Sequence, residues 1–390
     1  MTTNSSPSKY PIQAAMQKFY PEYQKCHVVD AEQRKTAECI MGCKTGKLGY
    51  SISTCTDCGY FQIHNASCNN RNCPCCQSAL QDVWVDARNS ELIENLPYYH
   101  AVFTIPSELN ALVYANQKEM YNLLFHSSSQ TLLKLSDDKT HLGAQPGIVS
   151  VLHTWGSALE YHPHIHTLVS GGGLTKRNTF LVASRKEFFI PLPILSSVFR
   201  GKFLFGLKKL FKKGKLIFPK SMEEQKTSYG WKKYLDQLYN IGWVTFIKET
   251  FGTNGNAVKY LARYAYRTAI SNARITEVTD ETVSFRWKNY KNGGAMEEMK
   301  LKGTEFVRRF LLHVLPSGFT RVRFSGYLSN SKRKKKLKLI RNLTNTVGIP
   351  LRLKGLKTRE LILALFHVDI GKCPCCNYDM THGRLKVKLE

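Results

Sequence analysis

The chain has 390 residues, and 56 Lys and Arg against 29 Asp and Glu give it a formal net charge of +27. Hydrophobic residues make up 43% and charged residues 22%, which supplies packed cores and excludes a disordered or collagen-like chain. The longest apolar runs, such as 361–366, are far shorter than the ~20 residues that span a bilayer, and the start lacks the apolar core of a secretion signal. We expect an intracellular protein of two or three domains, with no membrane contact and with nucleic acid as its polyanion partner.

The first predicted elements belong to a cysteine-rich module over residues 1–96. Helical periodicity covers residues 10–40 and 77–96, on either side of a segment rich in cysteine. Nine of the twelve cysteines fall between residues 26 and 76, and the other three lie within 373–376. Clustered Cys-x2-Cys pairs in an intracellular chain are typical of metal sites and not of a disulfide scaffold.

Two of these pairs have a spacing close to that of zinc ribbons. Cys55 and Cys58 form the first pair, Cys73 and Cys76 form the second, and 14 residues separate them. We therefore expect these four thiolates to bind one structural Zn²⁺. Cys43 and Cys68, together with a histidine, are candidates for a second zinc site. The chain contains no His-x-Glu motif, which excludes nucleobase deaminase chemistry and leaves zinc a structural role.

From residue 97 to 330 the pattern changes to strands separated by helices. Strands are predicted at 99–106, 147–155, 162–170, 242–249, 275–287 and 318–327, and helices at 109–135, 226–239 and 256–269. Several strands read as half-exposed rather than uniformly apolar. This favours an α+β fold, an antiparallel sheet with helices on it, over a doubly wound parallel sheet.

A basic C-terminal region, 331–390, follows this domain. Residues 331–360 hold eleven Lys or Arg against the single acid Glu360, and the stretch 200–220 is also basic and contains no acid. Both stretches lie outside the candidate catalytic motifs, so we expect them to contact the nucleic-acid backbone regardless of sequence. The segment 373–376, with the sequence CPCC, supplies half a metal site. Its possible partners are His382 and the spare N-terminal cysteines, or it has none.

The predicted strand 162–170 carries three histidines at alternate positions. His162, His164 and His166 project from one face of such a strand, because successive side chains alternate. Neutral imidazoles two residues apart on a rigid strand can bind one divalent ion. We expect His164 and His166 to be ligands, with His162 as the third and His153 on the preceding strand as its rival. Such a strand serves hydrolases, oxygenases and nucleases, and the net charge favours a nuclease.

The predicted helix 256–269 carries two tyrosines one turn apart. Tyr260 and Tyr264 share a face, and Arg263 and Arg267 form a charged row beside them. The simpler interpretation is an amphipathic helix with buried tyrosines. In a basic protein, however, a phenol can attack a phosphodiester to give a phosphotyrosine that conserves the bond for rejoining. Because the phenol pKa is ~10, such a tyrosine needs help from a metal ion or from arginine.

A histidine–hydrophobe–histidine strand followed by a tyrosine helix resembles the HUH endonuclease superfamily. Five segments, which include this strand and this helix, resemble in their order the two-tyrosine transposases of the IS91 family of insertion sequences. These segments are 67–77, 153–174, 260–275, 285–290 and 305–328. The resemblance implies an HUH-type sheet behind an N-terminal zinc-binding domain. It also implies Mg²⁺ or Mn²⁺ on His164 and His166, nucleophiles at Tyr260 and Tyr264, and zinc on the cysteines of the first module.

The function that this resemblance implies is rolling-circle transposition. Such an enzyme nicks and rejoins single-stranded DNA at insertion-sequence ends through a 5′-phosphotyrosine, with one tyrosine attacking first and the other serving the second step. We expect a bacterial protein of the cytoplasm, associated with the nucleoid. The alternatives are a replication initiator or relaxase of the same chemistry, against which the zinc module argues, and a zinc-dependent DNA-binding regulator without catalysis.

Overall fold

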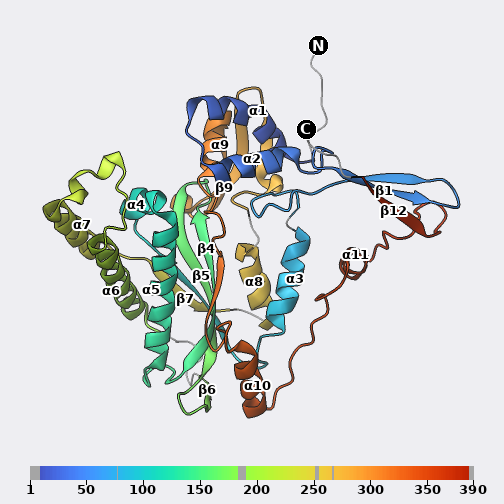
Figure 1. The fold of residues 1–390 in the computed structure, drawn as a ribbon. Coiled ribbons are helices and arrows are strands. Elements are labelled where there is room, and N and C mark those ends of the chain that lie inside the picture. The colour runs from blue at the N-terminus through green and yellow to red at the C-terminus, as the bar shows by residue number, and fades with distance from the viewer. Residues whose placement is uncertain (1–8, 77, 183–189, 251–253, 266–267, 386–390) are drawn as a thin grey trace.

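The computed structural model describes residues 9–76, 78–182, 190–250, 254–265 and 268–385, and an antiparallel sheet lies at its centre (Figure 1). The strands follow the order β11-β4-β5-β3-β7, and β6 pairs with β5. Their bounds are β3 (Tyr98–Thr104), β4 (Gln145–Trp155), β5 (Tyr161–Leu174), β6 (Phe180–Val182), β7 (Thr245–Glu249) and β11 (Val322–Gly326). This sheet and its helices confirm the predicted α+β class.

Helices cover both faces of the central sheet (Figure 1). One face packs on α4 (Asn110–Ala115), α5 (Gln117–Asp137), α6 (Leu192–Lys212) and α7 (Ser228–Asn240). The other face packs on α3 (Ser78–Asn89), α8 (Asn254–Ala265) and α10 (Arg333–Thr344). Because side chains alternate along β5, Ile165 and Val169 enter the first core, whereas Leu168 enters the second. His164 and His166 share the face of Leu168 and so lie toward α8.

The N-terminal helices share a core with a later part of the chain. Helices α1 (Pro11–Cys26) and α2 (Ala31–Gly42) pack against α9 (Gly303–Leu311) and the small sheet of β8 (Ile275–Val278), β9 (Thr282–Asn289) and β10 (Ala295–Lys302). The helical stretch predicted over 10–40 is split, because the Asp30 side chain accepts the Gln33 backbone N–H at 2.8 Å and starts a new helix. Phe19, Phe285 and Phe306 are buried together in this shared core.

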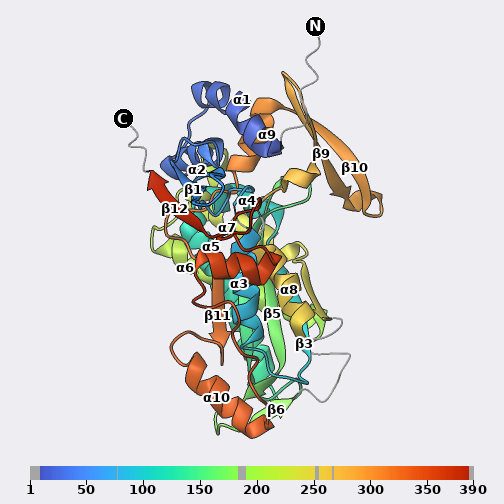
Figure 2. The ribbon, with the colours of Figure 1, turned by 90° about the vertical axis from the view of Figure 1, so that its right-hand side faces the viewer.

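The end of the chain returns to the N-terminal module (Figure 2). After α11 (Thr358–Phe366), strand β12 (Met380–Leu385) pairs with β1 (Tyr50–Cys55), which in turn pairs with β2 (Phe61–Asn65). Segments predicted as three consecutive domains are thus interleaved in the packing. Short 3-10 turns lie at Ser107–Leu109, Lys220–Met222, Glu224–Lys226, Asn272–Arg274 and Tyr290–Asn292. Within the described ranges, no helix combines the length and the apolar character needed to cross a membrane.

Candidate functional site

The sheet register brings four histidines to the face that α8 covers. His153 of β4 is directly opposite His164 of β5, and His166 of β5 lies between Val151 and Val102 on the neighbouring strands. His100 of β3 is opposite Leu168, so it shares this face. All four imidazoles are buried, with between 4% and 9% of the residue exposed. On this face, one histidine from each of the two neighbouring strands therefore joins the two histidines of β5.

Three of these histidines have the geometry of ligands to one ion. His164 Nε2 and His166 Nε2 are 3.0 Å apart, and a ring nitrogen of His153 lies within 4.8 Å of both. Two nitrogens about 2.1 Å from a metal at right angles to each other are about 3.0 Å apart. The residues present therefore fit a divalent ion.

The second nitrogen of each histidine in this group has a fixed partner. His164 Nδ1 lies 2.6 Å from the His162 carbonyl, and His153 Nε2 lies 3.0 Å from the Tyr264 carbonyl. His166 Nδ1 lies 2.9 Å from His100 Nε2. If each of these nitrogens donates its proton to its partner, the other nitrogen keeps its lone pair for a metal. This outer arrangement is typical of histidine metal sites.

The third member of the group is His153 rather than His162, the residue expected from the sequence. His162 contributes its backbone carbonyl to His164, and its imidazole is not part of the group. The register places His153 beside His164 across the strands. His162 lies beyond this pair, next to the irregular register between His153 and Trp155, and its ring is 5.0 Å from that of His164. Burial lowers the pKa of His164 to about 3 and holds the pKa values of His153 and His166 well below the usual one. The group is therefore uncharged at neutral pH, as metal ligation requires.

Helix α8 places Tyr264 directly on this histidine group. The Tyr264 ring stacks on His166 with centroids 3.8 Å apart, and it lies 5.0 Å from the His153 ring. Tyr260 lies one turn earlier on the same helix, which puts its Cα on the same face. The side chains of Tyr260 and Arg263 and the whole of Arg267 lie outside the described part of the chain. Of the predicted tyrosine pair, Tyr264 is thus the one whose ring position is known.

Arg321, which was not among the residues predicted from the sequence, links the end of α8 to β4. Arg321 Nη2 donates to the Tyr264 carbonyl at 2.9 Å, and its Nε donates to the Leu152 carbonyl at 3.2 Å. The guanidinium also lies 4.8 Å above the Trp155 ring, which in turn stacks on His153 at 4.2 Å. Arg321 therefore sets the position of the tyrosine helix relative to the histidines.

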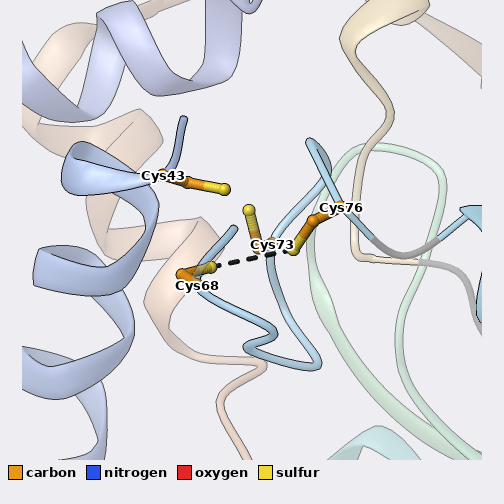
Figure 3. Close-up of side chains that lie close together, drawn as sticks. All are labelled: Cys43, Cys68, Cys73 and Cys76. Atoms are coloured by element: carbon orange, nitrogen blue, oxygen red, sulfur yellow. Dashed lines mark hydrogen bonds between the residues drawn. The ribbon is translucent and has the colours of Figure 1, made fainter. Parts of the chain in front are cut away.

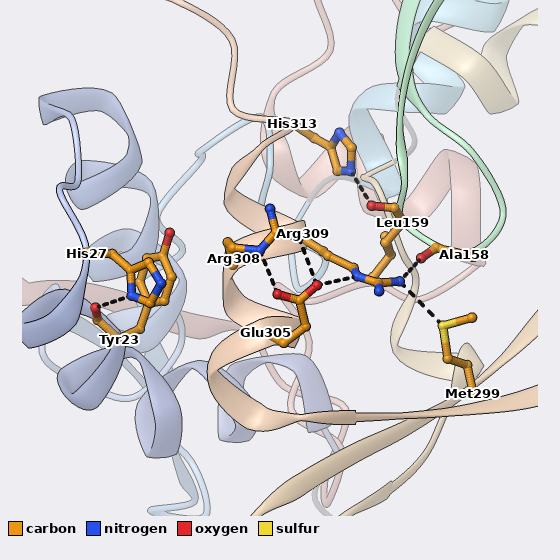
Figure 4. A network of polar contacts seen from close by, with 9 residues as sticks. All are labelled: Tyr23, His27, Ala158, Leu159, Met299, Glu305, Arg308, Arg309 and His313. Atoms are coloured by element: carbon orange, nitrogen blue, oxygen red, sulfur yellow. Dashed lines mark hydrogen bonds and ion pairs between the residues drawn. The ribbon is translucent and has the colours of Figure 1, made fainter. Parts of the chain in front are cut away.

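The turn that joins β4 to β5 is anchored on α9 (Figure 4). Arg309 Nη1 donates to the Ala158 carbonyl at 3.0 Å, and Glu305 accepts from Arg309 Nε at 2.7 Å. His313 Nε2 lies 3.3 Å from the carbonyl of Leu159, a fully buried residue with a φ of 61°. Because this turn is fixed at several points, the pairing of His153 with His164 cannot slip without breaking buried polar contacts.

Eight cysteines form two separate clusters of four, and the grouping differs from the predicted one. Cys43, Cys68, Cys73 and Cys76 form the first cluster (Figure 3), and the Sγ atoms of Cys68 and Cys76 are 3.8 Å apart. Sulfurs about 2.3 Å from one Zn²⁺ at tetrahedral angles are about 3.8 Å apart, so this set fits zinc.

The sequence spacing predicted that Cys55 and Cys58 share one site with Cys73 and Cys76. The structure places them outside that cluster. They group instead with Cys373 and Cys376. Cys55 ends β1, whereas Cys68 follows the opposite end of the β1–β2 hairpin, and a strand of this length separates the two ends by about 17 Å. The C-terminal CPCC segment thus has partners among the N-terminal cysteines, and His382 instead hydrogen-bonds Ser53 at 2.7 Å.

His100 and Arg321 are the site residues that sequence reasoning missed. His100 lies in a strand that was predicted correctly, but nothing local to that strand indicates that it will pair beside His166. Arg321 precedes β11, and its partners are more than fifty residues away along the chain. For His153, the signal was present as a histidine on the preceding predicted strand.

Comparisons with known proteins show the family to which the chain belongs. A family model described as "Putative transposase" matches residues 147–336, and one described as "Transposase zinc-binding domain" matches residues 15–105. A protein of Sinorhizobium fredii named "Putative transposase y4qJ" is 39% identical over 347 residues, covering 88% of this chain and 87% of the relative. The transposase for insertion sequence element IS801 of Pseudomonas savastanoi pv. phaseolicola is 24% identical over 299 residues, covering 76% and 70%.

A solved structure, the conjugative relaxase TRWC in complex with oriT DNA, also matches. It is 12% identical, covers 42% of this chain and 67% of its own, and has a TM-score of 0.21. The two family models and the first relative cover both the cysteine module and the histidine–tyrosine site. The chain therefore belongs to the IS91 family of transposases, with an N-terminal zinc-binding domain.

Proposed function

We propose that this transposase nicks and rejoins single-stranded DNA at the ends of an insertion sequence through a phosphotyrosine intermediate. One observation carries the proposal: three buried, uncharged histidines with the geometry of one ion site lie directly beneath the ring of Tyr264. A regulator that only binds DNA has no use for such a group. Membership of a transposase family supplies the biological setting for the cleavage.

The tyrosines of α8 act as nucleophiles in this proposal. The phenol oxygen of Tyr260 or Tyr264 attacks the scissile phosphorus, and the bond to the 3′ oxygen breaks. The phenol loses its proton, the 3′ oxygen gains one, and the 5′ phosphate remains esterified to the tyrosine. Rejoining is the reverse attack by a 3′-hydroxyl, and the second tyrosine serves the second cleavage. In this proposal Arg263 of α8 and Arg267, which follows the helix in the sequence, offset the charge that develops on the phosphate.

His153, His164 and His166 would hold the divalent ion that polarises the scissile phosphate. The sequence led us to expect Mg²⁺ or Mn²⁺. Of these two ions, Mn²⁺ accepts imidazole ligands more readily, because Mg²⁺ demands oxygen ligands. His100 and the His162 carbonyl orient two of the three imidazoles, and Arg321 holds the tyrosine helix above them. The enzyme would act in the cytoplasm on DNA of the nucleoid, with structural zinc in its cysteine module.

The decisive experiment detects the covalent intermediate. Purified protein is incubated with Mn²⁺ and with single-stranded oligonucleotides that span each end of the DNA element encoding the chain. We expect a band that is retarded in denaturing gels and carries the label only when the 5′-phosphate side of the cut is labelled. A Tyr260→Phe/Tyr264→Phe double variant should lose the band, and each single variant shows which tyrosine forms it.

Two variants separate chemistry from folding and binding. His164→Ala should abolish cleavage while retaining DNA affinity, because His164 lies in the buried ion site and not on a basic surface. Tyr290→Phe is the matched control for the tyrosine variants, since Tyr290 is 74% exposed and follows β9 in the small sheet, which is separate from the central sheet that carries the histidines. Adduct formation by the double tyrosine variant would refute the assignment of the nucleophiles. Full cleavage by His164→Ala would refute the metal site.

A further inference from the structure

The second cysteine cluster joins segments from the two ends of the chain. Cys55 and Cys58 lie at the end of β1 and in the turn after it, and Cys373 and Cys376 lie just before β12. The Sγ atoms of Cys55 and Cys376 are 3.5 Å apart, and those of Cys58 and Cys373 are 3.6 Å apart. The second pair spans 315 positions of sequence. Residues 373–376 lie outside the ranges that the two family models match, which are 147–336 and 15–105.

We propose that this cluster binds a zinc ion of its own and that the ion fastens the C-terminal segment to the β1–β2 hairpin. The sulfur separations are close to the about 3.8 Å expected for four thiolates around one Zn²⁺. Carboxylates and imidazoles are absent from the group, and an all-thiolate set selects zinc over the hard cations. This cysteine cluster shares no residue with the histidine group, so zinc binding here is independent of the nuclease chemistry.

Local backbone geometry repeats between the two clusters. Each contains the tetrapeptide CPCC, and in each the first and last residues of the tetrapeptide belong to the cluster. The backbone N–H of Cys75 points to Cys73 Sγ at 3.4 Å, and that of Cys375 points to Cys373 Sγ at 3.4 Å. Such N–H groups stabilise a thiolate and are what a metal-binding turn provides. The same sequence thus forms the same turn at a second site.

The small sheet around the second cluster has too little core to hold together by itself. Its hydrophobic cluster consists of Cys55, Cys373 and Met380, with Tyr60 and Cys376 packed against it. Every residue of β2 is exposed, and Phe61 and Ile63 are 64% and 54% exposed. Modules this small need a metal or a disulfide as a staple. Zinc binding at the second cluster supplies the folding energy that hydrophobic burial does not.

The ion fixes the far end of a segment that we call the strap, residues 345–372. Its first part is held by α3, where the buried carboxylate of Asp86 accepts the backbone N–H groups of Arg352 and Leu353 at 3.0 and 2.9 Å. Figure 2 shows the strap and α11 passing in front of α3 on the way to β12. With both attachments in place, the basic residues of the strap keep a defined position on the side of the molecule that carries α3 and α8.

The test measures the number of zinc ions per chain that are bound by cysteine thiolates. A mercurial thiol reagent displaces zinc from cysteines but not from histidines, and a chromogenic chelator measures the zinc released from the full-length protein. We expect two zinc ions per chain in the wild type and one in a Cys373→Ser/Cys376→Ser variant. Cys375→Ser is the matched control and should release two, because Cys375 lies within the same tetrapeptide but outside the cluster. Release of one ion from the wild type would overturn the proposal.

A second measurement on the wild type does not depend on the variant being folded. Cys58 and Cys375 are both exposed. In zinc-loaded protein, alkylation followed by mass spectrometry should label Cys375 and spare Cys58 until a strong chelator is added. Trypsin cleavage within the strap should leave the C-terminal fragment bound before chelation and release it afterwards. Labelling of Cys58 as fast as Cys375 with zinc present would refute the site, and loss of the fragment from zinc-loaded protein would refute the fastening.

Discussion

Replacing His100 by leucine tests whether the outer hydrogen bonds tune the ion site. His166 Nδ1 lies 2.9 Å from His100 Nε2, and both residues are buried, so water cannot take the place of the lost acceptor. Leaving a buried N–H without a partner costs about 1–3 kcal/mol. The alternative, moving the proton to His166 Nε2, would block the lone pair that faces the ion. At about 1.4 kcal/mol per factor of ten, His100→Leu should weaken Mn²⁺ binding about 5- to 150-fold.

The assay is the dependence of adduct formation on Mn²⁺ concentration, with calorimetric titration of Mn²⁺ as an independent measure. His100→Leu should need more Mn²⁺ for half-maximal rate and should approach the wild-type rate at saturation. His100→Gln, which restores an acceptor, should recover part of the affinity. His126→Leu is the control, because His126 is exposed on α5. A folded His100→Leu protein that binds Mn²⁺ as tightly as the wild type would refute the reasoning.

Three further predictions concern other parts of the molecule. Burial lowers the pKa of His313 to about 4, so below about pH 6.5 the unfolded chain takes up a proton that the folded protein does not, and stability falls as the pH falls. Between about pH 6.5 and 5, the wild type should lose about 1.5 kcal/mol more stability than His313→Gln in urea unfolding, and equal losses would contradict this. Arg321→Lys should form the adduct about 10- to 100-fold more slowly in single turnover, because the Tyr264 carbonyl loses a donor, and an unchanged rate would count against a positioning role. Lys334→Gln/Lys335→Gln should reduce the slope of log Kd against log salt by about 1–2 for any single strand tested, whereas an effect limited to one sequence would argue against backbone contacts.

Elements with a strong local pattern were predicted well, and elements without one were not. The strands expected at 99–106, 147–155 and 162–170 correspond to β3, β4 and β5, because each is an apolar stretch bounded by proline, glycine or polar residues. The helix expected over 109–135 is broken at Asn116, between α4 and α5. Strand β2 carries no burial pattern, since all its residues are exposed, and it offered none of the periodicity on which sequence prediction depends. Strand β10 does alternate exposed and half-buried residues along most of its length, but it was not predicted.

The sequence by itself determined the chemistry that the chain can offer. Histidines at alternate strand positions, tyrosines one helical turn apart and Cys-x2-Cys pairs are local patterns, and local geometry places such side chains on one face whatever the rest of the chain does. The family resemblance rested on the same patterns, and the comparisons confirm it.

Only the tertiary structure decided which of these groups meet. The position of a cysteine in the sequence does not say which other cysteines it will meet. Cys373 and Cys376 lie beside Cys55 and Cys58 because β12 pairs with β1. In the same way, strand register places His153 beside His164 and leaves His162 outside the group. Register and strand order are settled by burying two cores at once across the whole chain, and that information is not present in any single segment.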